Sequence, residues 1–342
     1  MASTDAAVAA AEAPAPAPAL APASAPAPVS SPSTRAAFAP AADVAAAEAF
    51  TRGLARGHYE NFSVVTALLP RHLRQDFCNV YAFCRLADDL ADDAATAGAA
   101  ALQHLDLFRE ALRACYAGRP DAAVYVALRR TIERHEIPVD PFLDLISAFE
   151  QDQRVTRYET YEELLDYCRR SANPVGRLVL YLCGYGDERR QRLSDYTCTA
   201  LQLANFWQDV RRDLRELGRV YIPKESLARF GVAEDDLWLP RATDELKRLI
   251  RFEVDRTEAM FAEGDALLPL LRPAVRRQVA LFGAGGRAVL QAIRRQGYDT
   301  LARRPVLSAR QKARLAARVV VCQVLGRLRW GHAAPGEHDR NR

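Results

Sequence analysis

The chain has 342 residues, of which 49% are hydrophobic and 26% charged, and its formal net charge is +4. This length and composition predict a soluble protein with a substantial core, and the lack of a long apolar run excludes a membrane-spanning segment. Basic and acidic residues are interleaved along most of the sequence, which argues against a nucleic-acid-binding protein.

The first 44 residues are predicted to be a disordered leader. They alternate Ala with Pro and hold 8 of the 19 prolines, a composition that favours extended, solvated chain. Asp5, Glu12 and the early prolines argue against a signal peptide. We therefore expect a cytoplasmic protein, with peripheral contact at the inner membrane face as an open alternative. We also expect deletion of residues 1–40 to leave activity unchanged.

Residues 45–330 are predicted to form one all-α domain, followed by a flexible tail at 331–342. Long Ala/Leu/Arg/Glu segments are separated by Pro, Gly and Asn, and few β-branched runs occur. Helices are expected near residues 45–56, 70–94, 99–117, 120–136, 139–151, 160–183, 187–217, 243–265, 270–296 and 308–328.

Three local features refine this scheme. Asn173, Pro174 and Gly176 should bend or interrupt the helix at 160–183. The glycines of GAGGR, residues 283–287, lack both the third glycine and the preceding strand of a dinucleotide loop, so they favour close helix packing. The last helix is basic and partly amphipathic, which favours docking on the domain and leaves contact with a membrane surface as an alternative.

A polar stripe interrupts the apolar segment FCNVYAFCRLADDLA at residues 77–91. Large apolar residues lie on every side of its helical wheel, which predicts a buried helix. Polar side chains nevertheless recur at steps of four, three and four, at Tyr81, Arg85, Asp88 and Asp92. This spacing places them on one helix face, which we expect to point into the protein interior.

A second segment, TALQLANFWQDVRRD, repeats the pattern. Its polar side chains are spaced by three, four and four residues, at Gln202, Asn205, Asp209 and Asp213. Two such faces predict one shared cavity.

The paired aspartates predict a magnesium site. An unpaired carboxylate in a low-dielectric interior costs roughly several kcal/mol, so four of them need cations. Mg²⁺ prefers oxygen ligands and takes a few carboxylates together with water and phosphate oxygens. We therefore expect Asp88, Asp92, Asp209 and Asp213 to hold Mg²⁺ on a diphosphate. The six histidines and seven cysteines lack the spacing of zinc ligands.

The sequence allows one alternative to the magnesium site and one alternative choice of its ligands. A single DxxxD pair is more often a solvated acidic helix end, although two such pairs in apolar segments weigh against that explanation. Asp89 and Asp93 also form an i, i+4 pair, rotated by one position, so the sequence leaves open which register binds metal.

With these motifs in place, the chain resembles the squalene/phytoene synthase family, whose members act on isoprenyl diphosphates. YAFCRLADDLADD and QLANFWQDVRRDLRELGRVYIP are similar to the two aspartate motifs of that family. HYENF at 58–62, YCRRSANPVGRLVL at 167–180 and QGYDTLARRPVLS near the C-terminus resemble its bacterial hydroxysqualene synthase branch.

The resemblance implies an isoprenoid-synthase helical bundle with both motifs at the mouth of an apolar pocket. By the same resemblance, the aspartates hold Mg²⁺, and further residues line the site or contact the diphosphate: Tyr81, Arg85, Asn61, Ser63, Tyr167, Gln202, Asn205 and Tyr221. Ser63 stands where this branch is expected to have Pro. Tyr81, Phe206 and Tyr221 are candidate cation-π partners for a carbocation.

The implied reaction is Mg²⁺-dependent conversion of presqualene diphosphate to hydroxysqualene by ionisation, rearrangement and capture of water. One alternative is condensation of two farnesyl or two geranylgeranyl diphosphates, to presqualene diphosphate or squalene and to phytoene respectively. A catalytically silent helical assembly factor is a third. The sequence leaves the oligomeric state and partner proteins open.

Overall fold

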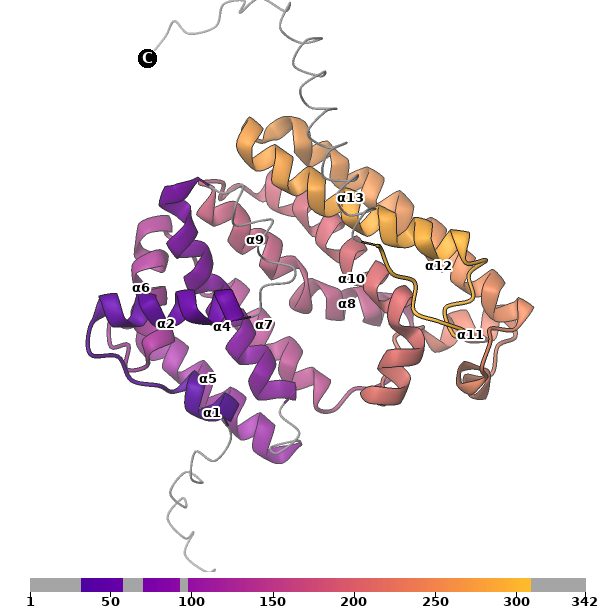
Figure 1. Cartoon of the computed structure of the whole chain (residues 1–342), viewed down its shortest axis with the longest axis horizontal. Coiled ribbons are helices and arrows are strands. Elements are labelled where there is room, and N and C mark those ends of the chain that lie inside the picture. Colours follow the sequence, from indigo (N-terminus) through magenta and orange to yellow (C-terminus); the bar gives the residue numbers. More distant parts are fainter. Residues whose placement is uncertain (1–31, 58–69, 93–97, 309–342) are drawn as a thin grey trace, which may run out of the picture.

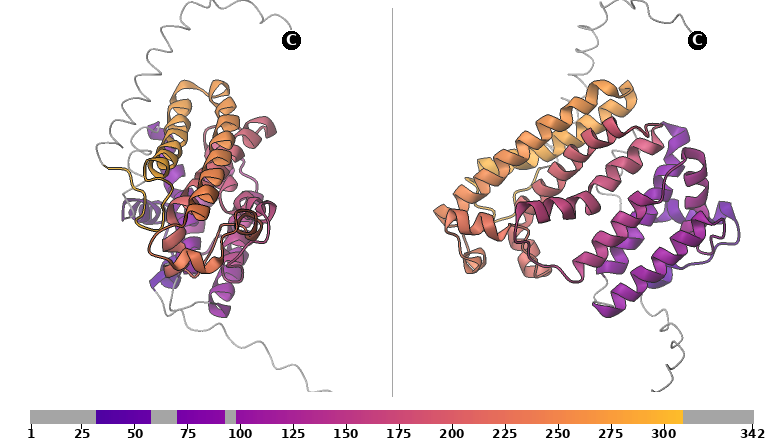
Figure 2. Two further views of the ribbon diagram at one scale, coloured as in Figure 1. Left: turned by 90° about the vertical axis from the view of Figure 1, so that its right-hand side faces the viewer. Right: turned by 180° about the vertical axis from the view of Figure 1, so that it is seen from behind.

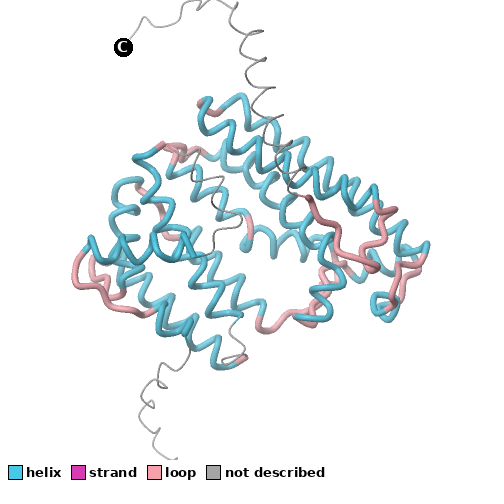
Figure 3. The backbone as a smooth tube through the Cα atoms, in the orientation of Figure 1, coloured by secondary structure: helices cyan, strands magenta, loops and turns pink. Residues whose placement is uncertain are grey.

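The computed structural model describes residues 32–57, 70–92 and 98–308, and these residues form a helical bundle (Figures 1 and 3). The predicted all-α class is confirmed, and extended pairing in these ranges is limited to one bridge between Pro40 and Ala122. The helices are α1 (Pro32–Ala37), α2 (Val44–Gly57), η1 (Arg71–Leu73), α4 (Arg74–Asp92), α5 (Ala99–Tyr116), α6 (Ala123–His135), α7 (Asp140–Asp152), α8 (Tyr161–Ser171), α9 (Asn173–Leu182), α10 (Glu188–Glu216), α11 (Lys224–Phe230), η3 (Glu234–Trp238), α12 (Asp244–Gly264), η4 (Asp265–Leu270) and α13 (Pro273–Arg295).

The helix predicted at 160–183 is two helices, α8 and α9, separated at Ala172. Pro174 has no backbone N–H to donate to the preceding turn, so the break falls where the sequence placed a bend. The short helices α1, α11, η3 and η4 were not expected, because their few residues carry little periodic signal. The helix expected at 308–328 lies outside the described residues, apart from Ser308, which is not helical.

The described, packed part of the chain begins before residue 45, where the domain was expected to start. Helix α1 packs against α4, and Ala37 is fully buried in the core around α4. The ring of Phe38 meets that of Phe108 edge-on at 6.3 Å. Deletion of residues 1–40 would therefore remove a core helix, contrary to the expectation that this segment is dispensable. Residues 1–31 and 331–342 lie outside the described residues.

Two hydrophobic cores divide the helices. The first surrounds α4 and includes Phe83, Phe108 and Phe142, contributed by α4, α5 and α7. The second surrounds α10 and includes Trp207 and Phe261. Helices α12 and α13 run side by side against α10 in every view (Figure 2). Each core thus carries one of the two aspartate motifs.

The glycines of α13 permit close helix packing, as expected. A Cβ atom on Gly286 would lie 2.4 Å from the ring of Phe261 on α12. The whole GAGGR segment is helical, which excludes a phosphate-binding loop at this position.

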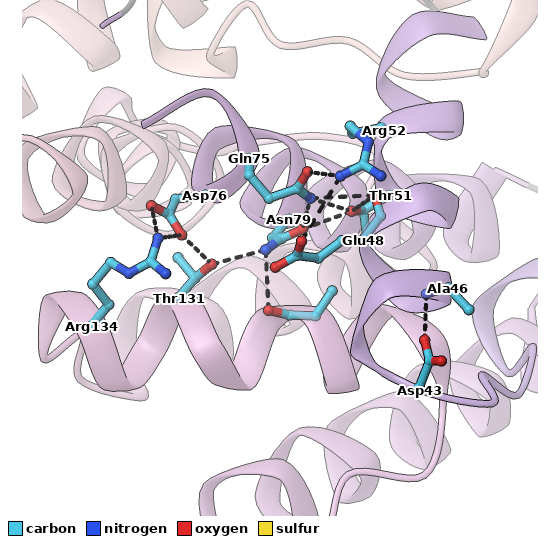
Figure 4. A network of polar contacts seen from close by, with 11 residues as sticks. Asp43, Ala46, Glu48, Thr51, Arg52, Gln75, Asp76, Asn79, Thr131 and Arg134 are labelled. Atoms are coloured by element: carbon cyan, nitrogen blue, oxygen red, sulfur yellow. Dashed lines mark hydrogen bonds and ion pairs between the residues drawn. The ribbon is translucent and has the colours of Figure 1, made fainter. Parts of the chain in front are cut away.

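A buried polar network fixes α4 against α2 and α6 (Figure 4). Asn79 donates to Thr131 Oγ1 at 3.0 Å and accepts from Thr51 at 2.7 Å. Asp76, in the first turn of α4, accepts from Thr131 and pairs with Arg134 at 3.0 Å. Because buried polar groups need fully matched partners, this network specifies how α4 sits in the bundle.

None of the described helices combines the length and the apolar character needed to cross a lipid bilayer.

Candidate functional site

The face of α4 that carries the first motif is only partly covered. Tyr81, Arg85 and Asp88 are half-buried, and Asp92 is exposed. The opposite face, with Phe83, Leu86 and Leu90, is fully buried. The expectation that the stripe points into the interior is therefore wrong for its last turn. A metal and a charged substrate need such access.

Partial burial and the neighbouring charge of Asp92 raise the pKa of Asp88 from 3.8 to about 6, although 41% of its side chain is exposed. Arg85 pairs with Asp89 one turn away and lies 3.4 Å from Asp88. The buried Nε of Arg85 has no hydrogen-bond partner. Arg85 thus pairs with Asp89 most closely and with Asp88 at a longer distance. Asp93 lies outside the described residues.

The second motif lies on α10, a 29-residue helix whose N-terminus is capped by Asp187. Its buried side is fixed by Trp207, whose Nε1 donates to Thr257 at 2.9 Å. On another face Gln202, Asp209 and Asp213 are half-buried and Asn205 is exposed. The predicted stripe therefore exists, along the line of α10 that is not packed into the core.

Asp209 is held by an arginine that sequence reasoning missed. Both of its carboxylate oxygens accept from the guanidinium of Arg304, with Nη2 to Oδ2 at 2.9 Å. One turn on, burial and the charge of Asp209 raise the pKa of Asp213 to about 7. A cation at this face would relieve the repulsion between the two carboxylates.

Asp152, at the end of α7, links the surroundings of the two motifs and was also missed. Its Oδ2 accepts from Tyr167 at 3.1 Å and lies 3.7 Å from Arg219. Burial is the main cause that raises its pKa to about 6, and the charge of Asp92 adds to it. The sequence did contain one sign of it: Asp152 directly follows an apolar predicted helix and has no basic residue one turn before it to pair with.

Four aromatic rings stack beside Asp152. Phe206 and Tyr221 are parallel, with centroids 3.7 Å apart and planes at 9°. Tyr167 stacks on both at 6.2 and 6.0 Å, and Tyr158 stacks on Tyr221 at 5.9 Å. Burial raises the pKa of Tyr167 and of Tyr221 above 10, so both stay protonated at neutral pH. Tyr158 was missed because it lies in the loop between α7 and α8, where no spacing pattern marks it.

The predicted residues therefore fall on α4, on α8 and on α10 with its following loop, and Figure 1 shows α7 and α8 between α4 and α10. Asn61 and Ser63 lie outside the described residues. Among the described residues, no three His, Cys, Asp or Glu side chains lie close enough together to hold a metal ion. The two acidic faces thus do not form a single carboxylate cluster.

The residues present nevertheless fit Mg²⁺. Each face offers a pair of carboxylates, and Mg²⁺ takes only a few of these besides water and phosphate oxygens. Burial, and then a neighbouring aspartate, raise the pKa values of Asp88 and Asp213, so a cation bound beside them would favour their ionised forms. In addition, the buried Oδ1 of Asp152 has no hydrogen-bond partner.

Comparisons with known proteins agree with this arrangement. Residues 55–311 match the family model described as squalene/phytoene synthase. The chain is 36% identical over 209 residues to a hydroxysqualene synthase of Rhodopseudomonas palustris, covering 61% of this chain and 70% of that protein. It is 34% identical over 260 residues to a phytoene synthase of Thermus thermophilus, covering 76% and 88%. The crystal structure of squalene synthase HpnC from Alicyclobacillus acidocaldarius is 50% identical, with TM-score 0.71, and covers 75% of this chain and 95% of that one.

Proposed function

Because the chain belongs to the squalene/phytoene synthase family of isoprenoid-processing enzymes, we propose that it converts presqualene diphosphate to hydroxysqualene with Mg²⁺. The observation that carries this proposal is the pair of partly exposed aspartate faces on α4 and α10. The likeness to a hydroxysqualene synthase and to squalene synthase HpnC supports the choice of reaction. Family membership also argues against a silent assembly factor.

In this proposal Asp88 and Asp92 on one side, and Asp209 and Asp213 on the other, hold Mg²⁺. The metal supplies positive charge that neutralises the departing diphosphate. Arg85, on the same helix face as Asp88, contributes a half-exposed guanidinium to the departing diphosphate. Gln202 and Asn205 lie on the same face as Asp209 and donate hydrogen bonds to the substrate head.

The reaction breaks the bond between carbon and diphosphate oxygen, and the electron pair leaves with the diphosphate. The cyclopropylcarbinyl cation rearranges, water adds to it, and a proton is released, so no reductant is needed. The stacked faces of Tyr167, Phe206 and Tyr221 stabilise positive charge next to them. Arg304 competes with a metal for Asp209, since its guanidinium pairs with both carboxylate oxygens.

Condensation of two prenyl diphosphates is the alternative that the comparisons keep open. A phytoene synthase is 34% identical to this chain, and such a reaction would use the same aspartate faces. The two reactions differ in substrate and in where water enters, so they must be separated by experiment.

The deciding experiment supplies the purified protein and Mg²⁺ separately with presqualene, farnesyl and geranylgeranyl diphosphate, and identifies the products by mass spectrometry. We expect hydroxysqualene from presqualene diphosphate only. Phytoene, or squalene and presqualene diphosphate from farnesyl diphosphate, would replace the proposed reaction with a condensation.

An aspartate variant tests the proposed metal face. Asp88→Asn should lower kcat by roughly 10²-fold or more, because it removes charge that must be present when diphosphate departs. Asp106→Asn, at a carboxylate that is 70% exposed on α5, is the matched control and should keep full activity. Full activity of the Asp88 variant would contradict the assignment.

A further inference from the structure

Gln153, one residue beyond α7, holds the end of α4 that carries the first aspartate pair. Its Nε2 donates to the carbonyl oxygen of Ala91 at 2.8 Å, and its Oε1 accepts from the N–H of Gly98 at 3.3 Å. Carbonyls in the last turn of a helix have no partner within the helix, so this bond comes from outside α4. Ala91 directly precedes Asp92 and lies one turn from Asp88.

The residue before Gln153 is held in turn by the loop after α10. Arg219 donates from Nη2 to the backbone carbonyl of Asp152 at 3.0 Å, and its Nη1 lies 3.7 Å from the carboxylate of Asp152. The backbone N–H of Arg219 donates to the carbonyl of Asp213 at 3.0 Å. The Arg219 and Asp152 side chains are 12% and 9% exposed, so water competes little for these bonds.

These contacts form one path of three hydrogen bonds joined by covalent links, here called the strut. It runs from the backbone of Asp213 through Arg219 and through Asp152 and Gln153 to the backbone of Ala91. Its two ends lie within the two aspartate motifs. The buried apolar residues around Ala91 on α4 belong to the first hydrophobic core, and those around Asp213 on α10 belong to the second. The strut therefore ties together two helix segments that are packed in different cores.

We propose that Gln153 is a positioning residue that fixes the Asp88/Asp92 face relative to the Asp209/Asp213 face, so that both faces bind one metal–diphosphate assembly. Gln153 itself would touch neither metal nor substrate. Bound metal and diphosphate require placement to within about 0.5 Å, which two separately packed helices achieve only if their relative position is fixed. This inference rests on the proposed use of both faces for diphosphate, and it adds the residue that sets their spacing.

The alternative is that Gln153 merely stabilises the fold. A structural role would lower the melting temperature without a selective effect on ligand binding. If Gln153 has a positioning role, its loss should weaken the binding of Mg²⁺ with pyrophosphate and raise KM. The kcat at saturation should change little, because the bound ligand itself brings the two faces together and part of its binding energy is used for this.

The test compares Gln153→Met with Gln191→Met in the full-length protein. Gln191 is a matched control, because its side-chain amide also donates to a backbone carbonyl, that of Gly186, at the opposite end of α10 from Asp209. Isothermal titration calorimetry measures the affinity for Mg²⁺ with inorganic pyrophosphate. We expect Gln153→Met to weaken it by about tenfold, as loss of a contact that orients metal ligands does, and Gln191→Met to leave it unchanged.

Turnover gives a second readout. In Gln153→Met the KM should rise by about tenfold and kcat should stay within about threefold of the wild type. Should that variant fail to fold, Gln153→Asn keeps the amide but is one methylene too short to reach both Ala91 and Gly98, and the same loss is expected.

Equal pyrophosphate affinity in the wild type and the Gln153 variants would overturn the positioning role, as would an equal loss in Gln191→Met. A wild-type protein that does not bind Mg²⁺ and pyrophosphate would overturn the proposed function together with the positioning role of Gln153. If the wild type binds them but leaves presqualene diphosphate unconverted, only the assigned reaction fails, and the calorimetric comparison still decides the role of Gln153.

Discussion

At the scale of single residues, three carboxylates are kept at a cost to the folded state. Asp88, Asp152 and Asp213 have pKa values raised to about 6, 6 and 7, with burial as the largest cause in each case. A folded-state pKa above the unfolded value of 3.8 means that the folded protein binds more protons between about pH 4 and pH 7. Through these groups, stability therefore falls as pH rises across that interval.

Asp213→Asn should accordingly stabilise the metal-free protein at neutral pH. In EDTA, the variant should melt a few degrees above the wild type at pH 8, as about 1 to 2 kcal/mol would produce, and near the wild-type temperature at pH 4. The measurement is thermal unfolding from pH 4 to pH 8, with Asp106→Asn as the exposed control. A melting-temperature difference that does not change with pH would show that burial of this charge costs nothing.

At the scale of elements, α4 is supported on several sides. The network around Asn79 and Asp76 fixes it against α2 and α6, while α1 packs on it and Gln153 holds its end. The buried face of α4 is fixed by packing, so its acidic face is presented in a defined direction.

Ala37→Asp tests the support given by α1. A charge at this fully buried position cannot be solvated without moving α1 off α4, so we expect a loss of about 2 to 4 kcal/mol and a clearly lower melting temperature. The matched control is Ala42→Asp, at an exposed position before α2, which should change the melting temperature by no more than a degree or two. Equal losses of melting temperature in the two variants would show that α1 does not contribute to the core.

At the scale of the whole molecule, two cores carry one acidic face each, and a ligand that touches both faces should stabilise the whole bundle. Mg²⁺ with pyrophosphate at 100 times the dissociation constant should add about 2.7 kcal/mol, or several degrees of melting temperature. Differential scanning fluorimetry with Mg²⁺ alone, with pyrophosphate alone and with both would show this, and EDTA should reverse it. No shift with both present would argue against joint binding.

Much of this arrangement is predictable from the sequence because it depends on local spacing. The steps between Tyr81, Arg85, Asp88 and Asp92 define a helix face wherever that helix lies. Contacts between residues that are far apart in the sequence are not predictable in this way. Arg304 and Asp209 are 95 positions apart, and Gln153 and Ala91 are 62 apart. Nothing in the spacing of either pair indicates contact, since it arises from how complete helices pack.

The solvent exposure of the Asp88 stripe could not be predicted from the spacing of its residues either. Apolar residues surround the Asp88 stripe in sequence, but whether another helix covers the stripe depends on the bundle. The short helix α1 was missed for a related reason: six residues cannot establish a period, and its burial comes from α4 rather than from its own propensity.

The ion pair between Arg304 and Asp209 has a practical consequence for ligand discovery. Fragments screened against protein kept in chelator must compete with a guanidinium, which favours amidines and other planar cations. If metal and pyrophosphate bind as proposed, the same library screened with both in the buffer would meet a position already filled by cation and anion, which would favour apolar fragments. The choice of buffer will therefore decide which chemical series is found.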